Sequence, residues 1–271
     1  MTGRRQRALR SRVALRIAFA SSVALSNVAL SAHAAELTVD QVRAIVAQAR
    51  AGTPVDLAHK DLSDLDLSNL DFTGVNLSGA NLFASRLVSS NFTGANLAGA
   101  NLNGAWLMGA QFAGANLSGS SMLGLVILGG TVTARPNFAG ANLSRVRMIA
   151  DLPNTDLHGA NLRDARLGVD IRNQGMGQMR TDLSNAKLSG ADLAGADLSR
   201  SVMAFADLRD ANLRGANFFA VKLGGADLRG ADVAGADFTE ADLDGTVFTG
   251  ARGLDAAKGI DKAANRDRAV Y

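Results

Sequence analysis

Residues 91–119 read NFTGANLAGANLNGAWLMGAQFAGANLSG, and an apolar residue returns at every fifth position of this stretch. A small residue usually stands two positions before each apolar centre, with Asn or Asp between them and Gly two positions after the centre. Working outward in both directions, we find 36 such units, and Ala occupies the small position in 20 of them. The repeating unit is therefore A-(D/N)-L-x-G, and it fills most of the chain between residues 55 and 253.

A period of five excludes the common regular structures. Residues five apart lie on opposite faces of a straight strand and about 140° apart around an α-helix. A chain that turns a corner after each unit keeps every centre inside, and the x-G pair supplies that corner because Gly tolerates the positive φ of a type II turn. Phe72, Phe92 and Phe112 are 20 residues apart, as are Phe218 and Phe238. If like residues stack on like, four units form one coil.

These units resemble the pentapeptide-repeat family from about residue 55 to residue 253. The resemblance implies an all-β solenoid, a right-handed quadrilateral β-helix, and 36 units predict about nine coils stacked ~4.8 Å apart. The first coil departs from the pattern, because Lys60, Leu65 and Leu70 occupy its small positions. Two interruptions, residues 128–137 and 168–182, break the frame, and we expect them to leave the solenoid as loops.

The ends of an open β-helix need covering because their backbone edges are unpaired. Residues 35–54 predict an N-terminal capping helix, in which Thr38 and Gln41 form a capping box and the residues that follow give one apolar face. At the other end, residues 254–271 predict a C-terminal cap and tail. We expect a closing turn from Gly253 and a frayed polar tail to Tyr271.

Residues 1–34 have the pattern of a bacterial secretory signal peptide. Six arginines precede the first acid, Glu36, and a weakly apolar stretch and the site Ala32-His33-Ala34 follow them. The pattern predicts cleavage before Ala35 and a periplasmic or secreted protein, whose net charge would be −3 instead of +3 without the six arginines. An uncleaved membrane anchor and an organelle transit peptide are the alternatives. The pair Arg4-Arg5 is only a weak indication of twin-arginine export.

The sequence offers no catalytic or cofactor site. It has no Cys, and His59 and His158 have no Ser and carboxylate partners that the sequence predicts. It contains no phosphate-binding loop, dinucleotide fingerprint or metal-ligand spacing. Stacked acids such as Asp207 and Asp227 could hold a cation, but an Asp before a repeat centre usually bonds neighbouring backbone groups. We therefore predict a non-enzymatic protein without cofactor or metal.

Two surface features are candidates for binding a partner. An apolar stripe on a wall that is polar elsewhere predicts a protein or homodimer interface, or a landing place for the loop that follows it. It consists of Phe83, Val88, Trp106, Met108, Leu123, Val126 and Leu128. A basic belt in residues 135–180 could meet an anionic cell-envelope partner or be a solvated face. It consists of Arg135, Arg145, Arg147, Arg163, Arg166, Arg172 and Arg180.

Two functions follow, and the first is favoured: an exported scaffold or protein-interaction module that presents a rigid surface. The alternative is a DNA mimic that inhibits or protects a nucleic-acid enzyme such as a topoisomerase, as some members of the resembled family do. Residues 182–251 hold eleven acids and six bases, which is roughly 0.3 net charge per Å against about 0.6 for B-DNA. That low density and the leader disfavour mimicry. A hydrolase built on the solenoid is a distant third.

Overall fold

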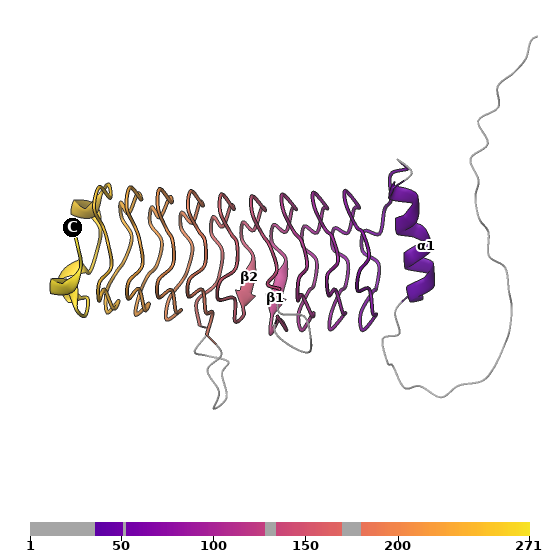
Figure 1. The fold of residues 1–271 in the computed structure, drawn as a ribbon, viewed down its shortest axis with the longest axis horizontal. Helices are drawn as coiled ribbons and strands as arrows, with labels where there is room; N and C mark the ends of the chain where they lie inside the picture. The colour runs from indigo at the N-terminus through magenta and orange to yellow at the C-terminus, as the bar shows by residue number, and fades with distance from the viewer. Residues whose placement is uncertain (1–35, 51–52, 128–133, 170–179) are drawn as a thin grey trace, which may run out of the picture. The chain divides into compact units, whose positions relative to one another are not determined.

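The computed structural model describes residues 36–50, 53–127, 134–169 and 180–271. The predicted leader lies outside the described residues, and so does the larger part of both predicted loops. His33–Tyr271 forms one compact unit, in which successive coils of the chain lie side by side along one axis (Figure 1). Among the described residues, no helix is long and apolar enough to cross a membrane.

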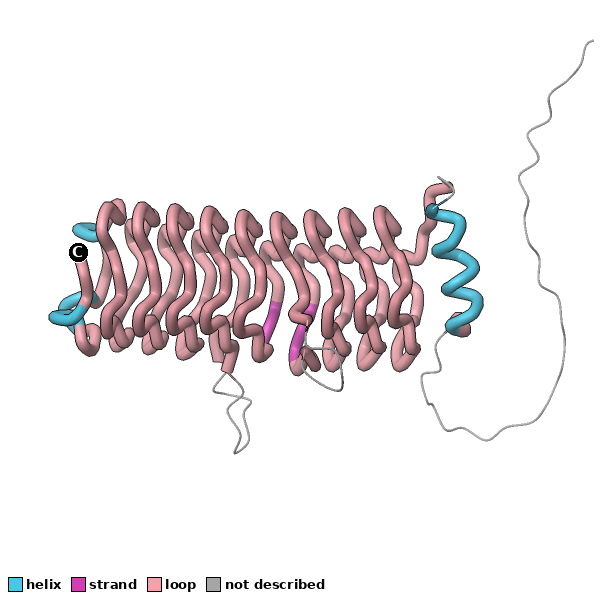
Figure 2. Tube along the Cα trace, viewed as in Figure 1, coloured by secondary structure: helices cyan, strands magenta, loops and turns pink. Residues whose placement is uncertain are grey.

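Parallel bridges join each coil to the next. Asp56 bridges Asn76, and Asn76 bridges Asn96, at a separation of 20 residues. Four such columns run along the unit, so each coil has four sides. In the described part of the chain only β1 (Ser121–Leu123) and β2 (Arg147–Ile149) are regular enough to count as strands, and the rest is bridges and turns (Figure 2). The predicted β-helix solenoid is confirmed.

Each five-residue unit satisfies its backbone through the neighbouring coils. The Leu77 N–H donates to the Asn96 carbonyl of the next coil (2.7 Å), and the Asn96 N–H donates back to the Val75 carbonyl (3.0 Å). Within the turn, the Ala80 N–H donates to the Leu77 carbonyl (3.0 Å). Gly79 between them has φ +64°, as a type II turn requires of its third residue. The period of five is thus the length of one side plus its corner.

The interior is a set of apolar columns. Phe72 stacks on Phe92 with ring centroids 4.7 Å apart, and Phe92 stacks on Phe112 at 4.9 Å. Phe218 and Phe238 stack in the same way at 5.0 Å. These spacings confirm that residues 20 apart lie on top of one another. Because the rings are fully buried, they contribute both burial and aromatic contact to stability.

Three changes of frame are absorbed at corners: an insertion within residues 128–137, a deletion after β2, and a second insertion within residues 168–182, across which Asn161 bridges Asp192. Gln111 bridges Asn137, because residues 128–133 are inserted before the chain rejoins its column. One residue is missing after β2, so the amides of Asn142 and Asn161 meet at a separation of 19. The interior columns continue through all three changes, since the residues on either side remain buried. The solenoid tolerates insertions at its corners because a corner residue carries no interior side chain.

At the amino-terminal end lies α1 (Val39–Arg50) (Figure 1). The Thr38 N–H donates to Gln41 Oε1 (2.8 Å), and the Gln41 N–H donates to Thr38 Oγ1 (3.3 Å), which is a capping box. Val42 and Val46 are buried in the same apolar cluster as the solenoid interior. Two bulky residues at the small positions of the first coil pack against this cluster, Leu65 and Leu70.

The carboxyl-terminal tail differs from the expectation of fraying, because it winds one more coil. Three short 3₁₀ turns take the place of the usual corners: η1 (Leu254–Ala256), η2 (Ile260–Lys262) and η3 (Arg266–Arg268). Between them Lys258, Ala264 and Val270 bridge the preceding coil. The Tyr271 ring stacks on Phe248 with centroids 5.5 Å apart. The polar sequence suggested a frayed tail, but its charged residues lie on exposed turns of an ordered coil.

Candidate interaction surface

The four walls carry different side chains, and we name each by the residue that starts its column of bridges. Wall A starts at Asp56, wall B at Asp61, wall C at Asp66 and wall D at Asp71. Along every wall, the residues before and after each centre point outward. The residue before the centre bonds the backbone, as when Asn76 Oδ1 accepts from the Ser78 N–H (3.2 Å). This confirms the predicted role of the repeated Asx residues.

Most of the predicted apolar stripe gathers around one corner, between walls B and C. Phe83 (48% exposed) and the half-buried Leu123 lie on wall B. Trp106 and Val126, both half-buried, bridge one another on wall C. The corner between the walls is thin, because its residues are small: Ala84, Gly104 and Gly124. We call the four apolar side chains on either side of this corner, Phe83, Trp106, Leu123 and Val126, the B–C corner surface. Leu128 lies outside the described residues.

Two members of the predicted stripe are not available to a partner, which corrects the sequence-based expectation. Val88 is 9% and Met108 4% exposed. They occupy the same outward column of wall C in neighbouring coils, and the Ser89 N–H donates to the Met108 carbonyl (2.8 Å). Side chains stacked at a coil spacing of about 4.8 Å cover one another, so an apolar column hides much of its own surface.

Trp106 is the most fully supported side chain of the surface. The Arg86 guanidinium carbon lies 4.8 Å from the Trp106 ring centroid, which is the geometry of a cation–π contact. Arg86 Nε also lies 3.5 Å from Asp66 Oδ2. Hydrogen bonding by Ser68, whose N–H donates to Asp66 Oδ1 (3.1 Å), lowers the pKa of Asp66, with a smaller contribution from Arg86. Arg86, held by Asp66, thus lies against one face of the indole, and the Trp106 side chain remains half-buried.

The sequence-based reasoning missed two apolar residues. Ile149 pairs with Leu123 across β1 and β2 and extends the B–C corner surface by one coil. Its signal was hidden by the one-residue deletion that follows it. Phe205 is 67% exposed and has φ +57°, a conformation that costs a bulky residue strain. It could have been found as an aromatic residue at a corner position where Gly is usual.

Neighbouring coils also decide which corners need Gly. The His59 ring lies over Gly79, where an added Cβ would come within 2.4 Å of Nδ1. The Phe205 ring covers Gly225 in the same way, at 2.5 Å. His59 and His158 are both exposed. His158 Nδ1 lies 2.8 Å from Asp156 Oδ1, and this contact helps to hold the pKa of Asp156 below its usual value against the raising effect of burial.

The predicted basic belt does not form one continuous surface. Arg163 is paired with Asp192 on wall A (3.2 Å), and Arg135 is half-buried at the corner between walls C and D. Arg180 is exposed at the start of another side, and Arg172 lies outside the described residues. Arg163 adjoins Arg145, and the Arg145 N–H donates to the Arg163 carbonyl (2.8 Å). Around the same corner, between walls A and B, three described belt members form no ion pair: Arg145, Arg147 and Arg166.

The stacked acids of wall D are engaged by arginines. Arg209 Nε donates to Asp207 Oδ1 (2.8 Å) and lies 3.8 Å from Asp227 Oδ2, and Arg229 Nε donates to Asp227 Oδ1 (2.9 Å). These hydrogen bonds lower the pKa of both aspartates. Among the described residues, no three His, Cys, Asp or Glu side chains group as metal ligands do. The arrangement is an ion-pair column.

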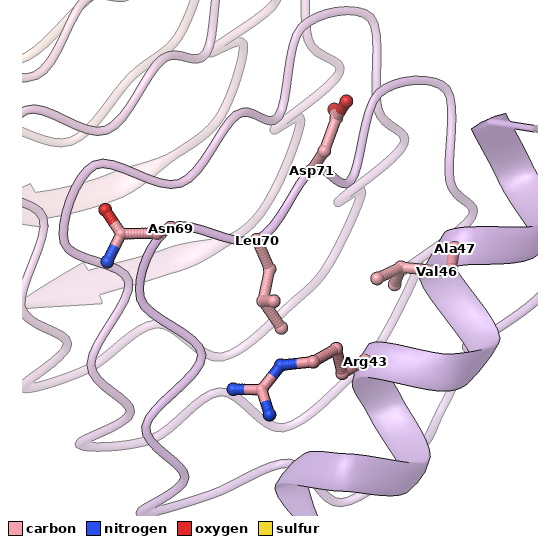
Figure 3. A pocket seen from close by; sticks show the side chains of 6 residues that line it. All are labelled: Arg43, Val46, Ala47, Asn69, Leu70 and Asp71. Carbon is pink, nitrogen blue, oxygen red and sulfur yellow. The ribbon is translucent and has the colours of Figure 1, made fainter.

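A pocket of about 280 Å³ lies between α1 and the first coil (Figure 3). Arg43, Val46 and Ala47 line it from α1, and Asn69, Leu70 and Asp71 line it from the coil. Arg43 Nη1 donates to the exposed Asp40 (2.9 Å). The lining combines apolar side chains, Val46, Ala47 and Leu70, with the polar side chains of Arg43, Asn69 and Asp71.

Comparison with known proteins agrees with the repeat. A family model described as pentapeptide repeats matches eight copies, in residues 55–88, 85–122, 135–168, 179–215 and 216–252. HetL, a pentapeptide repeat protein involved in heterocyst differentiation regulation in the cyanobacterium Nostoc sp. strain PCC 7120, is 28% identical. The match covers 87% of this chain and 95% of HetL, with a TM-score of 0.36.

Two further solved structures are similar. Rfr23 from the cyanobacterium Cyanothece 51142 is 24% identical over 45% of this chain and 90% of its own, with a TM-score of 0.24. QnrB1, a plasmid-mediated fluoroquinolone resistance protein, is 17% identical over 73% and 93%, with a TM-score of 0.35. No curated protein matches the sequence.

Proposed function

The chain belongs to the pentapeptide-repeat family, and from this premise we propose that it is an exported, non-enzymatic interaction module. It presents the B–C corner surface to a protein partner. One observation carries the proposal: apolar side chains on two walls meet over neighbouring coils at one corner made of small residues, whereas most other coils carry polar side chains at these positions. Apolar patches of this kind mark interaction sites when polar residues surround them.

The finer architecture belongs to the same proposal. About nine coils would make a rigid body, with α1 as the cap of its amino-terminal end and residues 254–271 closing the other. Rigidity matters for binding, because a surface that is already ordered loses little conformational entropy when it meets a partner. The backbone hydrogen bonds between coils, 2.6–3.4 Å long in the solenoid, supply that order.

Trp106 is the expected hot spot of the surface. An indole buried at the centre of an interface commonly contributes about 2 kcal/mol or more to binding. Arg86 already fixes one face of the ring, so little side-chain freedom remains to be lost. Phe83 and Leu123 flank it across the corner and would exclude water from its edge.

The test is Trp106→Asp, with Val202→Asp as its matched control. Val202 occupies the equivalent position on wall C in the carboxyl-terminal coils and is also half-buried. We expect Trp106→Asp to abolish association with the partner, or with a second copy in analytical ultracentrifugation. Val202→Asp should leave it intact, and neither change should shift the melting temperature by more than a few degrees.

Fluorescence gives an independent readout, because Trp106 is the single Trp of the chain. Association should shift its emission to the blue and shield it from a soluble quencher. Trp106 emission that stays red-shifted and freely quenched at every protein concentration, with and without added periplasmic extract as a source of partners, would contradict the proposal. A large loss of thermal stability in a Trp106→Asp protein that stays monomeric would instead assign the surface to folding.

The alternative function is that of a DNA mimic. Such a protein would have to be in the cytoplasm, where the nucleic-acid enzyme that it binds is found. The acidic coils of residues 182–251 are its basis. Several of their carboxylates are paired with arginines, which lowers the charge that a DNA-binding surface would meet: Asp192, Asp207, Asp227 and Asp232. Cell fractionation separates the two functions. A processed protein in the periplasm supports the interaction module, and a full-length cytoplasmic protein supports the mimic.

A further inference from the structure

Charges that stack between neighbouring coils are matched almost everywhere on the described walls. Arg86 lies beside Asp66 on wall C, and Arg214 lies 3.2 Å from Asp232 on wall A. On wall D, Arg209 reaches Asp227 of the next coil. Matching is expected, because like charges placed directly opposite on paired strands destabilise the pair.

Two stacked pairs of like charge have no ion-pair partner among the described residues: the carboxylates of Asp151 and Asp182 on wall C, and a pair of arginines on wall B. Arg147 and Arg166 are bridge partners on neighbouring coils, and both side chains are exposed. Arg145, also exposed, stands two residues before Arg147 at the adjoining corner. Within the described part of the chain, none of these three guanidinium groups forms an ion pair. Three positive charges thus lie together without a counter-charge.

Two acids stand beside these arginines in the neighbouring coils, and neither forms an ion pair with them among the described residues. Asp197 is the next residue of the column, but its Oδ1 accepts from the Ser199 N–H and from Asn217 Nδ2, each at 3.0 Å. Asp164 stands at the same corner as Arg145 in the next coil, and its carboxylate lies over Gly195, 2.6 Å from where a Cβ would be. Neither carboxylate comes within ion-pair distance of the three arginines in the described structure.

We propose that Arg145, Arg147 and Arg166 form a binding site for a phosphate group. Coils stacked about 4.8 Å apart place two guanidinium groups close enough to share one tetrahedral anion. Each guanidinium presents a planar fork of donors, and a phosphate offers enough oxygens to accept from several forks at once. A single carboxylate can satisfy only one fork. Binding would replace the repulsion between Arg147 and Arg166 with charge-assisted hydrogen bonds.

This site is independent of the B–C corner surface. It uses different side chains and a different corner. An experiment that disproves one of the two proposed sites therefore leaves the other untouched. It also narrows the basic belt: Arg163 is neutralised by Asp192, and Arg135 is half-buried at a distant corner. What remains is a compact group of three.

The first experiment measures melting temperature in sodium phosphate and in sodium chloride at equal ionic strength. We expect phosphate to raise the melting temperature of the wild type by a few degrees, with saturation, beyond the effect of chloride. Arg166→Gln and Arg147→Gln should lose this gain. The matched control is Arg214→Gln, which removes an arginine that is already paired on wall A, and it should keep the full gain.

The same variants test the repulsion. In low salt without phosphate, Arg166→Gln should melt no lower than the wild type, because it removes one of two opposed charges. Equal gains from phosphate in the wild type and in Arg166→Gln, or no gain beyond chloride in the wild type, would overturn the proposal. Isothermal titration calorimetry with inorganic phosphate measures the same binding without relying on unfolding.

A second arm distinguishes the source of the phosphate. Sedimentation with vesicles of a phosphodiester-bearing anionic lipid, with neutral vesicles as reference, tests a membrane surface. Co-sedimentation that Arg166→Gln abolishes would identify the lipid headgroup as the ligand. Binding of inorganic phosphate without co-sedimentation would identify a soluble phosphate compound.

Discussion

The amino-terminal coils, residues 55–127, and the carboxyl-terminal coils, residues 181–251, share one interior and differ in their exteriors. In both, Leu and Phe centres are fully buried and Ala is the usual small neighbour. Outside, the amino-terminal coils carry amides and an apolar corner, whereas the carboxyl-terminal coils carry aspartates and arginines. The difference teaches that the repeat constrains only the inward positions, because these alone must pack. A partner can therefore be recognised only through the outward ones.

The amino-terminal exterior is held by a ladder of amides along wall A. Asn96 Nδ2 donates to Asn76 Oδ1 and Asn116 Nδ2 donates to Asn96 Oδ1, each at 3.0 Å. The ladder continues through Asn142 and Asn161 at 3.1 Å. An amide can donate and accept at once, so identical side chains can stack without repulsion. No carboxylate column could do this unaided.

The largest expected effect tests whether the two interiors are equivalent. Leu97 and Leu193 are both fully buried centres on wall A, one in each region. Replacing either with Ala should cost about 2–5 kcal/mol, from lost burial and the cavity left behind. Denaturant unfolding measures both. As a control, Ser78→Ala on the outside of the same wall should change stability by less than about 0.5 kcal/mol.

A clear inequality between the two leucines would break this comparison. If Leu97→Ala were costly and Leu193→Ala nearly neutral, the carboxyl-terminal coils would have to be held by their surface ion pairs. We expect the two losses of stability to be similar, because exposed ion pairs contribute too little to replace the burial of Leu193.

A smaller effect should distinguish the two exteriors. Asn96→Ala removes three hydrogen bonds: the two amide contacts and the one that Oδ1 accepts from the Ala98 N–H (3.3 Å). Net contributions near 1 kcal/mol each predict a loss on the order of 1–3 kcal/mol. Asn212→Ala removes two bonds, and its acceptor Asp192 keeps Arg163. It should therefore cost less. Thermal unfolding of the two variants measures both losses of stability. Equal losses would show that the amide ladder does not stabilise the amino-terminal coils more than the single amide–carboxylate contact stabilises the carboxyl-terminal coils.

The smallest effect depends on pH and is tested on the aspartate–arginine column of the carboxyl-terminal coils. The hydrogen bond from Arg229 lowers the pKa of Asp227 in the folded protein. A lowered folded pKa stabilises the fold above the unfolded pKa of about 3.9, and the contribution is lost as pH falls through the folded pKa. Arg229→Gln should thus be less stable than the wild type near pH 6, and the gap should close below about pH 4.

Asn96→Ala is the control for that experiment, because an amide does not titrate and its deficit should not change with pH. Added salt should shrink the Arg229→Gln deficit at pH 6, since exposed ion pairs are screened. A deficit that is constant from pH 6 to pH 3 would contradict the assignment of the aspartate–arginine column as its source.

The interior of this protein could be predicted from particular residues. Phe72, Phe92 and Phe112 indicated both the coil length and their own stacking, because a period in sequence becomes a column in space when the chain winds regularly. The candidate surface could be predicted only in part. Trp106 and Phe83 were found as apolar residues at polar positions, but nothing in the sequence showed that Met108 would be covered. Phe205 was missed because apolar residues were sought only among those that flank the centres, although an aromatic residue at a corner where Gly is usual would have indicated it.

The sequence by itself determined the repeat, the inward residues and the number of sides, since each follows from a local rule that every unit repeats. Only the tertiary structure decided which outward side chains meet. An insertion lengthens the step between the stacked amides of Asn116 and Asn142 to 26 residues, and a deletion shortens the next step to 19. Arg147 therefore faces Arg166 and not the residue 20 positions on. Neighbours across coils depend on the length of every corner between them, which is a property of the whole winding.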